Sequence, residues 1–476
     1  MGWIVNTSVH RLGCLSRRDV LGTLMINGIS MGGVIGARSE ATTYSKSSAP
    51  RAKSILVLFA GGGQSQFETW DPKPHAPAEI RGAFGSIQTR VPGVRFCEHL
   101  PRLANLADRF CVFRSMSHDD LDHGTACYLT LTGRHHTLKS ANPLPSGNDH
   151  PSLSSVYGYV RPAKGLPFSS VNLNGPLLIP TMPGPGQDGG FLGKGPAPSC
   201  VGDPMKPLAS AMGIENIVDL SAVRIDGRRV LVRQVDALRA SIETGNSTNE
   251  WDYQTEKAYS LLRSSRLKTA LDISSELSSN IDRYGDNRTG RACLLGRRMI
   301  EAGVPWVTVF LNHSIRGQDD HPDSPEWYGW DTHNDIFQSL KHQLLPSFDK
   351  AFSALIEDMS NRGLLRDTLV VCLGEFGRAP LVALEKRFSG ATPGRKHWAS
   401  AYSMVALGAG VCGGSVIGET DRFGGSVQSN RATPADVAAT MFDAIGVDPH
   451  GTFTDNQGRV IQLTEGIPIR SWWSGK

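Results

Sequence analysis

The stretch "SILVLFAGGGQSQFETWDPKP", residues 54–74, decides the fold class, because an apolar strand runs directly into a glycine-rich polar loop. Residues 54–60 are apolar at successive positions, which is typical of a strand covered on both faces of a sheet. Comparable runs recur at 110–116, 304–312, 368–374 and 402–408. Helical patterns lie between them, at 123–133, 291–303, 347–364 and 433–447. This alternation predicts an α/β fold with a mostly parallel central sheet and helices on both faces.

Three features of the chain refine this prediction. The runs 54–60 and 368–374 are apolar on both faces and are expected to be central strands. In the helix at 433–447, Thr433 is the expected N-cap, Pro434 takes the first helical position and Gly446 ends the helix. Residues 205–290 are polar and charged, and they predict a helical insertion within a single domain that spans 51–476.

Composition excludes several classes of protein. The 476 residues carry a net charge of +4 and are 39% hydrophobic, which fits a soluble globular protein and argues against nucleic acid as a partner. The chain has 8 cysteines but no CxxC pair, so a zinc ribbon is excluded. Cys111 and Cys372 lie inside apolar strand patterns and are expected in the core. An oxidising compartment would allow one or two disulfides among the others.

The first 50 residues resemble an export signal. Arg17 and Arg18 precede a weakly apolar stretch interrupted by Gly, Asn and Ser, as in twin-arginine signals. Small residues at 37–41 suit cleavage, and a polar linker follows. An ordinary secretory signal and a membrane helix are the alternatives, but the interruptions disfavour a span. We expect a periplasmic or secreted protein that uses the twin-arginine machinery and has no stable membrane span in its mature form.

Polar residues follow the strands of the predicted sheet. In open α/β sheets, ligands bind outside the carboxyl ends of the strands. Histidine together with carboxylate suits zinc, manganese or iron better than calcium. Each residue also has a structural alternative: Asp331 could cap a helix, for example, and Glu375 could pair with Arg378. The residues at this edge are Gly61, Gly62, Gly63, Gln64, Ser65, His118, His123, Asp331, His333, Glu375, Arg378 and His397.

Several motifs occur together in a fixed order. They are "GGGQSQFETWDPKP", "EIRGAFGSIQTRVPGV", "EHLPRLANLADRFCVFRSMSHDDLDHGTACYLTLTGR", "WDTHND", "GEFGR" and "KHW". The chain thereby resembles the exported bacterial family of unknown function numbered fifteen-oh-one, which is grouped with the alkaline phosphatase–sulfatase superfamily. The resemblance runs from about Ser54 to the C-terminus. It implies an alkaline phosphatase-like fold and a metal-dependent hydrolase of phosphate or sulfate esters, borne by a small molecule or a polymer.

The resemblance also implies roles for individual residues. The ending "LTGR" places His123 in the nucleophile position, where sulfatases have Cys or Ser, and Cys127 stands where their arginine is expected. Asp331 and His333 resemble the later metal cluster of the superfamily, and His397 resembles its last histidine. Glu375 replaces an Asp-His pair. The acidic residue usual after the first strand is missing.

We therefore expect Asp331, His333, Glu375 and His397 to hold one divalent transition metal, zinc or manganese. His118 and His123 are further ligands or proton-transfer groups, and Thr125 is an alternative nucleophile at a helix N-terminus. Arg378 is expected to offset charge on the oxyanion. The backbone of Gly61, Gly62 and Gly63, with Gln64 and Ser65, is expected to bind an oxyanion. The rival hypothesis is a non-catalytic exported binding protein on a degenerate hydrolase scaffold.

Overall fold

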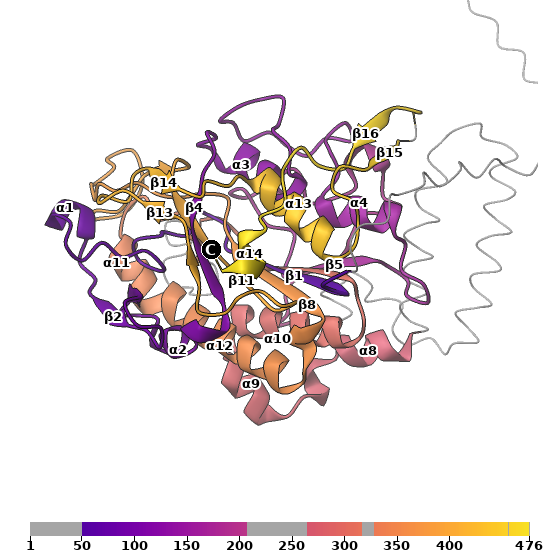
Figure 1. The fold of residues 1–476 in the computed structure, drawn as a ribbon, viewed down its shortest axis with the longest axis horizontal. Coiled ribbons are helices and arrows are strands. Elements are labelled where there is room, and N and C mark those ends of the chain that lie inside the picture. Colours follow the sequence, from indigo (N-terminus) through magenta and orange to yellow (C-terminus); the bar gives the residue numbers. More distant parts are fainter. Residues whose placement is uncertain (1–49, 207–263, 317–327, 456, 476) are drawn as a thin grey trace, which may run out of the picture. The chain divides into compact units, whose positions relative to one another are not determined.

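A computed structural model describes residues 50–206, 264–316, 328–455 and 457–475, and these residues belong to one compact unit, 44–476 (Figure 1). The predicted signal and linker lie outside the described residues except for Pro50. Residues 207–263, the larger part of the predicted insertion, also lie outside them.

The centre of the fold is an eight-stranded sheet. Its strands in spatial order are β12 (Val416–Ile417), β4 (Cys111–Met116), β11 (Tyr402–Leu407), β8 (Thr368–Leu373), β1 (Ser54–Phe59), β7 (Trp306–Phe310), β5 (Ser170–Leu173) and β6 (Ser199–Val201). The prediction that 54–60 and 368–374 form central strands is confirmed, because β1 and β8 pair with each other in parallel near the middle of the sheet.

One strand runs against the others. β11 pairs antiparallel with both β4 and β8, whereas all other neighbours in the sheet are parallel. The mostly parallel prediction is therefore confirmed. The reversed strand has a consequence for the site, because its N-terminal end lies at the edge where the other strands have their carboxyl ends.

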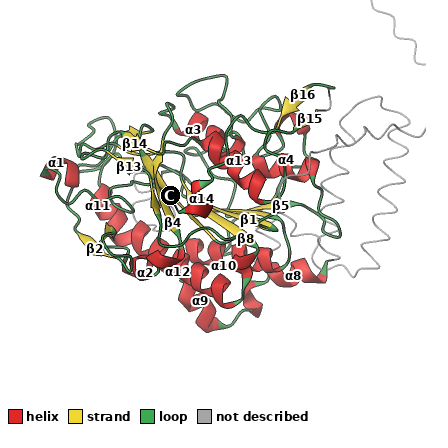
Figure 2. Cartoon of the chain, in the orientation of Figure 1, coloured by secondary structure: helices red, strands yellow, loops and turns green. Residues whose placement is uncertain are grey.

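Successive residues of the central strands enter two different cores. In β1, Leu56 and Leu58 belong to one core, and Ile55 and Val57 belong to the other. The first core also contains residues of α10 (Arg288–Glu301) and α12 (Leu345–Asn361), and the second contains residues of α4 (Leu153–Val160) and α13 (Pro434–Ala444). Helices thus cover both faces of the sheet, as the apolar strands predicted (Figure 2).

The helix ends agree with the local sequence. Thr433 caps α13 and forms a capping box with Asp436, Pro434 is the first helical residue, and Gly446 has a left-handed backbone with φ 77° just past the end. The other helices are α1 (Ala78–Arg81), α2 (Pro101–Asn105), α3 (His123–Thr132), α8 (Ser265–Leu271), α9 (Ser278–Tyr284), α11 (Ile336–Ser339) and α14 (Ser471–Ser474). A π-helical turn, Leu340–Leu344, joins α11 to α12. Short 3₁₀ turns occur at Ala107–Arg109, Gly190–Leu192, Ile273–Ser275 and Leu364–Arg366.

Among the described residues, four two-stranded sheets lie outside the central one. They pair β2 (Ser86–Gln88) with β3 (Arg95–Cys97), β9 (Gly377–Arg378) with β10 (His397–Trp398), β13 (Glu419–Thr420) with β14 (Val427–Ser429), and β15 (Thr452–Thr454) with β16 (Val460–Gln462). The β9–β10 pair sets Arg378 opposite His397, two residues of the predicted site.

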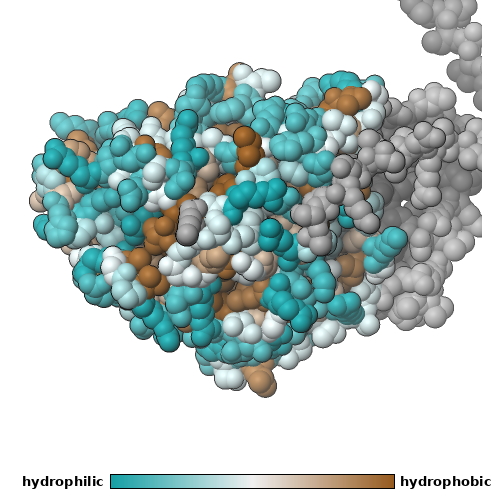
Figure 3. Space-filling model, viewed as in Figure 1, coloured by the Kyte–Doolittle hydropathy of each residue, from teal (hydrophilic) through white to brown (hydrophobic). Residues whose placement is uncertain are grey.

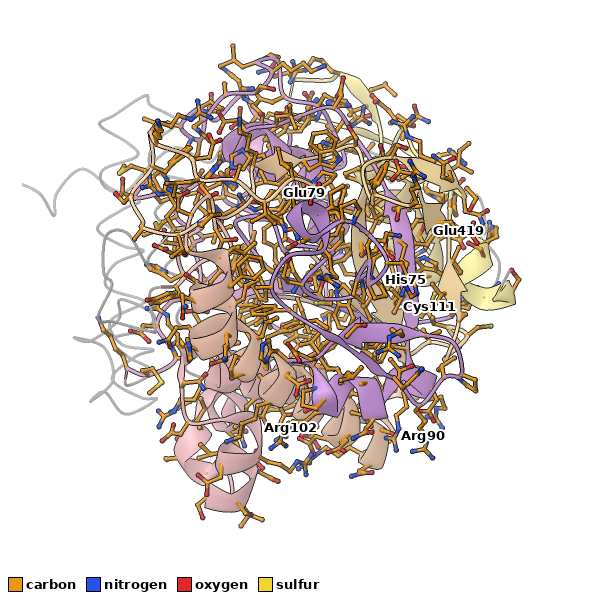
Figure 4. The ribbon with its side chains drawn as sticks, turned by 90° about the vertical axis from the view of Figure 1, so that its left-hand side faces the viewer. His75, Glu79, Arg90, Arg102, Cys111 and Glu419 are labelled. Atoms are coloured by element: carbon orange, nitrogen blue, oxygen red, sulfur yellow. The ribbon has the colours of Figure 1, made fainter. Side chains whose placement is uncertain are left out.

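The described cysteines, Cys97 to Cys412, are all free. Cys111, labelled in Figure 4, and Cys372 are buried in the core as expected. Within the described ranges, no helix is both long and apolar enough to cross a membrane. The face in Figure 3 is mostly hydrophilic, with small separate apolar areas.

Candidate metal centre

Three histidines surround one carboxylate oxygen. The Nε2 atoms of His123 and His397 each lie 3.2 Å from Oδ1 of Asp331, and Nε2 of His333 lies 3.3 Å from it. Nε2 of His333 and His397 are 2.9 Å apart. All four residues are buried or nearly so. The edge of the sheet therefore holds a compact set of nitrogen and oxygen donors.

The backbone brings these four side chains from distant parts of the chain. His123 is the first residue of α3, where the N-cap Asp122 accepts a hydrogen bond from its backbone N–H. Asp331 and His333 follow β7 in the chain, and Glu375 follows β8. His397 comes shortly before β11 and reaches the same edge because β11 is antiparallel to its neighbours.

The glycines after β1 admit the chain that carries Asp331. Gly62 has φ +110°, and a Cβ there would lie 2.4 Å from the backbone nitrogen of Asp331 and 2.7 Å from that of Trp330. Asn312 clamps the preceding residue, accepting from the N–H of Gly61 and donating to its carbonyl. The glycine run is thus required for close backbone packing at this point.

Arg378 fixes the position of the Asp331 carboxylate. Its guanidinium donates to Oδ1 of Asp331 at 2.8 Å and to the carbonyls of Gly62, Gly63, Trp330 and Arg395. The side chain is fully buried. Arg378 thereby fixes both the glycine loop and the Asp331 carboxylate.

Two of the three histidine rings are held through the nitrogen that points away from Asp331, and the third is held by stacking. Nδ1 of His397 donates to the carbonyl of Leu121 at 2.6 Å, and Nδ1 of His123 lies 2.6 Å from Oε1 of Glu375. The ring of His333 stacks on Phe388 with centroids 3.8 Å apart. A histidine whose far nitrogen donates to a carboxylate or carbonyl is the usual arrangement around a bound metal.

Charge is distributed unevenly over these groups. Burial opposes the charge on His123, but Asp331 and Glu375 outweigh that cost and raise the pKa of His123 to about 9. Burial also opposes ionisation of Asp331, but His123 and Arg378 hold its pKa well below the ordinary range. Burial lowers the pKa of His333 to about 2 and also lowers the pKa of His397, so these two rings are neutral at pH 7.

The donors fit a metal ion. Because a carbonyl only accepts, Nδ1 of His397 carries the proton and its Nε2 lone pair faces the Asp331 carboxylate at 3.2 Å. Two acceptors at this distance repel each other unless a cation or proton lies between them. Zinc–ligand distances of about 2.0–2.2 Å place the ligand atoms of a tetrahedron about 3.3–3.6 Å apart. The observed separations of 2.9–3.3 Å are close to that spacing.

A family profile described as "Protein of unknown function (DUF1501)" matches residues 52–471. The chain belongs to this family. No curated protein matches the DUF1501 chain. The match therefore assigns the chain to a family but gives no activity for it.

Solved structures resemble the DUF1501 protein only distantly. Ps i-CgsB is 10% identical with a TM-score of 0.39, covering 89% of this chain and 77% of its own. Phosphonate monoester hydrolase SpPMH from Silicibacter pomeroyi is 11% identical with a TM-score of 0.38 and the same coverages of 89% and 77%. PsFucS1 sulfatase from Pseudoalteromonas sp. is 12% identical with a TM-score of 0.35, covering 83% and 68%. Similarity at this level transfers neither a substrate nor a reaction.

The structure brings together part of the predicted ligand set of the DUF1501 protein. Among the four predicted ligands, His333 and His397 each have Nε2 within 3.3 Å of Oδ1 of Asp331. Glu375 does not reach Asp331 and instead contacts His123, which occupies the position expected of Glu375. One ligand atom from each of His123, Asp331 and His397 lies within 4.8 Å of the other two.

Other predicted site residues have their polar atoms in use elsewhere. Both ring nitrogens of His118 are occupied, since Nε2 donates to the carbonyl of Glu375 and Nδ1 accepts from the N–H of Asp120. The hydroxyl of Thr125 is buried and donates to Asp120 at 2.6 Å.

The predicted oxyanion loop is occupied in part by the protein itself, although the side-chain nitrogen of Gln64 is buried without a hydrogen-bond partner among the described residues. The N–H groups of Gly61 and Gly62 donate to Asn312 and Glu375. The carbonyl oxygen of the Gln64 side chain accepts from Trp70, and Ser65 donates to Glu68, which is paired with Arg395. The N–H groups of Gly61 and Gly62 are therefore not available to a ligand, and the loop instead supports the site residues through its hydrogen bonds.

Sequence reasoning missed three contributors. These are the carbonyl of Leu121, the ring of Phe388, and Gln66, whose side-chain amide bonds the backbone of Arg378 in both directions. A carbonyl and a single phenylalanine in a loop give no local signal. The repeated glutamines of "GQSQ" were visible, but nothing local showed which of them pointed inward.

Proposed function

We propose that this protein is an extracytoplasmic, metal-dependent hydrolase of phosphate or sulfate esters. The observation that supports it most directly is the convergence of three histidine Nε2 atoms on Oδ1 of Asp331. Histidine and carboxylate in this number suit a transition metal, and three nitrogens with one oxygen favour zinc over manganese.

In this proposal, Asp331, His123, His333 and His397 hold the metal. When bound there, a divalent metal supplies Lewis-acid polarisation of an ester oxygen and lowers the pKa of a bound water. Glu375 orients His123, the carbonyl of Leu121 orients His397, and Arg378 fixes Asp331. These contacts keep the donors in place without further rearrangement.

Water is the nucleophile that the geometry leaves available. Thr125 and His118 are already hydrogen-bonded to the protein, and His123 has both nitrogens directed at carboxylates. In the hydrolysis, the water oxygen bonds to phosphorus or sulfur while the bond to the alcohol oxygen breaks. The alcohol then leaves with one proton of the water. This assignment departs from the covalent nucleophile that the superfamily resemblance implies.

A non-catalytic exported binding protein is the second candidate. It is favoured by one observation, that Arg378 is saturated by backbone carbonyls and by Asp331. A hydrolase of anionic esters usually presents a cation to the transition state, and the contacts of Arg378 leave it unavailable for that role.

The test combines metal analysis with turnover. Purified protein should contain about one zinc per chain, and His397→Ala should lower zinc affinity by on the order of 100-fold or more, because it removes a ligand. His75→Ala is the matched control, since His75 is exposed and remote in sequence from the site (Figure 4). A panel of phosphate monoesters, phosphate diesters and sulfates should be hydrolysed, and a chelator should abolish the hydrolysis.

Two outcomes separate the candidates. A well-folded protein that binds no transition metal and turns over no ester would reject the hydrolase and favour the binding protein. Metal binding that is unchanged in His397→Ala would reject this site as the metal centre.

A further inference from the structure

A cleft opens beside the candidate metal centre. Its volume is about 430 Å³, and both Asp331 and His333 form part of its lining. This volume lies within the range of roughly 300–1,000 Å³ that is typical of small-molecule sites. The cleft therefore has room for the part of a ligand that does not react.

One wall of the cleft is fixed by the fold itself. The amide of Asn334 donates to three carbonyls in the loop 385–389. The carboxylate of Asp335 accepts from the backbone N–H groups of 391 and 392. These two side chains hold the loop against the cleft and have little capacity left for a ligand.

The facing wall carries polar side chains without such partners. Gln338 and Ser339 belong to α11, and His342 and Gln343 belong to the π-helical turn that follows. Residues four apart lie on one side of a helix, so these residues form two neighbouring rows. The side chains of Gln338, His342 and Gln343 make no hydrogen bond to any other residue that the structure describes. A π-turn at this place fits a functional surface, since such turns recur at functional sites.

The chemistry of the lining excludes other ligand classes. Phe388 stacks on His333, and the guanidinium of Arg387 lies over the same ring, so this ring offers no open apolar face to an acyl chain. Asp331 is paired with Arg378. Among the described lining residues, Arg316 is the sole lysine or arginine, which is too little positive charge for a polyanion.

We propose that this cleft binds the alcohol part of the ester as a polyhydroxylated group, a sugar or a similar polyol, with Gln338, His342 and Gln343 as specificity-determining residues. A primary amide offers both donors and an acceptor, and an alcohol hydroxyl also donates and accepts, so the two are complementary without charge. The inference rests on the proposed ester hydrolase for its reaction. The predicted preference for a polyol concerns ligand binding alone, so it can be tested separately from hydrolysis.

The experiment compares three alcohol parts on the zinc-loaded protein. The probes are glucose 6-sulfate and 6-phosphate, hexyl sulfate and phosphate, and p-nitrophenyl sulfate and phosphate. Glucose esters should give the highest kcat/KM. The double variant Gln338→Ala with Gln343→Ala should raise KM for them by on the order of 10- to 100-fold, from two lost hydrogen bonds, with kcat nearly unchanged. Turnover of p-nitrophenyl esters should stay within about twofold. Gln457→Ala, an exposed glutamine in the β15–β16 turn, is the control.

The outcomes distinguish this inference from the proposed function. Equal preference for hexyl and glucose esters, or an equal loss for all three classes in the double variant, would overturn the polyol cleft while leaving the hydrolase intact. If no ester is hydrolysed, calorimetry with glucose 6-sulfate and hexyl sulfate decides. Selective glucose-ester binding that is lost in the double variant supports the cleft and rejects hydrolysis, and no binding rejects both.

Discussion

Glu375→Gln is the substitution that best separates the sequence-based site from the observed one. The sequence placed Glu375 among the metal ligands, whereas the structure places its carboxylate behind His123. Oε1 lies 2.6 Å from Nδ1 of His123 and accepts from the N–H of Gly62 at 2.8 Å. The side chain is fully buried. Glutamine keeps the size of the side chain and one oxygen acceptor, removes the charge, and replaces the second oxygen with an NH2 group.

The expected size of the effect follows from this indirect position. Replacing a group that orients a metal-bound histidine typically lowers metal affinity by about 10- to 100-fold. This corresponds to about 1.4–2.8 kcal/mol of binding free energy. Loss of a direct ligand, as in His397→Ala, should cost considerably more. Zinc affinity should therefore rank wild type above Glu375→Gln and Glu375→Gln above His397→Ala.

The assay is competition for zinc with a chromogenic chelator, at matched pH and protein concentration. Urea unfolding of the metal-free proteins checks that each variant folds. Glu419→Gln is the control for removal of one negative charge, since Glu419 is exposed on β13 (Figure 4). Affinity in Glu375→Gln as low as in His397→Ala would make Glu375 a ligand after all. Affinity equal to wild type would refute the orienting role.

Three further predictions address packing, charge and export. Gly62→Ala should destabilise the protein by about 3 kcal/mol or more in urea unfolding and weaken zinc binding, because a Cβ would lie 2.4 Å from the backbone nitrogen of Asp331. Gly93 is also at positive φ but has nothing within 4 Å, so Gly93→Ala should cost only about 1 kcal/mol. Equal losses of stability in the two variants would contradict the packing argument. Although burial opposes the charge of Glu276, bonds from Asn280, Arg297 and Arg298 lower its pKa to about 2 from 4.5, so its stabilisation is complete above about pH 4.5 and is lost as the pH falls towards 2. The stability difference between wild type and Glu276→Gln, on the order of 1 kcal/mol at pH 7 once solvent screening is allowed for, should shrink across that window, and a difference that is constant with pH would argue against the charge. Arg17→Lys with Arg18→Lys should leave the protein in the cytoplasm in cell fractionation, and unchanged export would remove the twin-arginine assignment.

The sequence by itself determined five of the eight strands of the central sheet and some of its covering helices, but not β5, β6, β12 or α4. Strands β1, β4, β7, β8 and β11 and helix α13 lie where the apolar runs and the Thr433-Pro434 start predicted them. A strand that is buried on both faces has a continuous apolar sequence, and helix capping depends on residues only a few positions apart, so both signals are local. The chemistry-bearing residues were equally visible, because histidines and carboxylates follow strand ends.

Only the tertiary structure decided how those residues meet. The direction of β11 is set by its pairing with β4 and β8, and an apolar strand has the same local pattern in either direction. That reversal brings His397, which precedes its strand, to the edge where Asp331 and His123 lie. The contact of Glu375 with His123 depends on separations of a few ångströms between side chains about 250 residues apart in the chain, which no local pattern specifies. The glycines after β1 predicted a tight loop. The backbone of Asp331 approaches Gly62 through a long-range contact, which only the tertiary structure reveals.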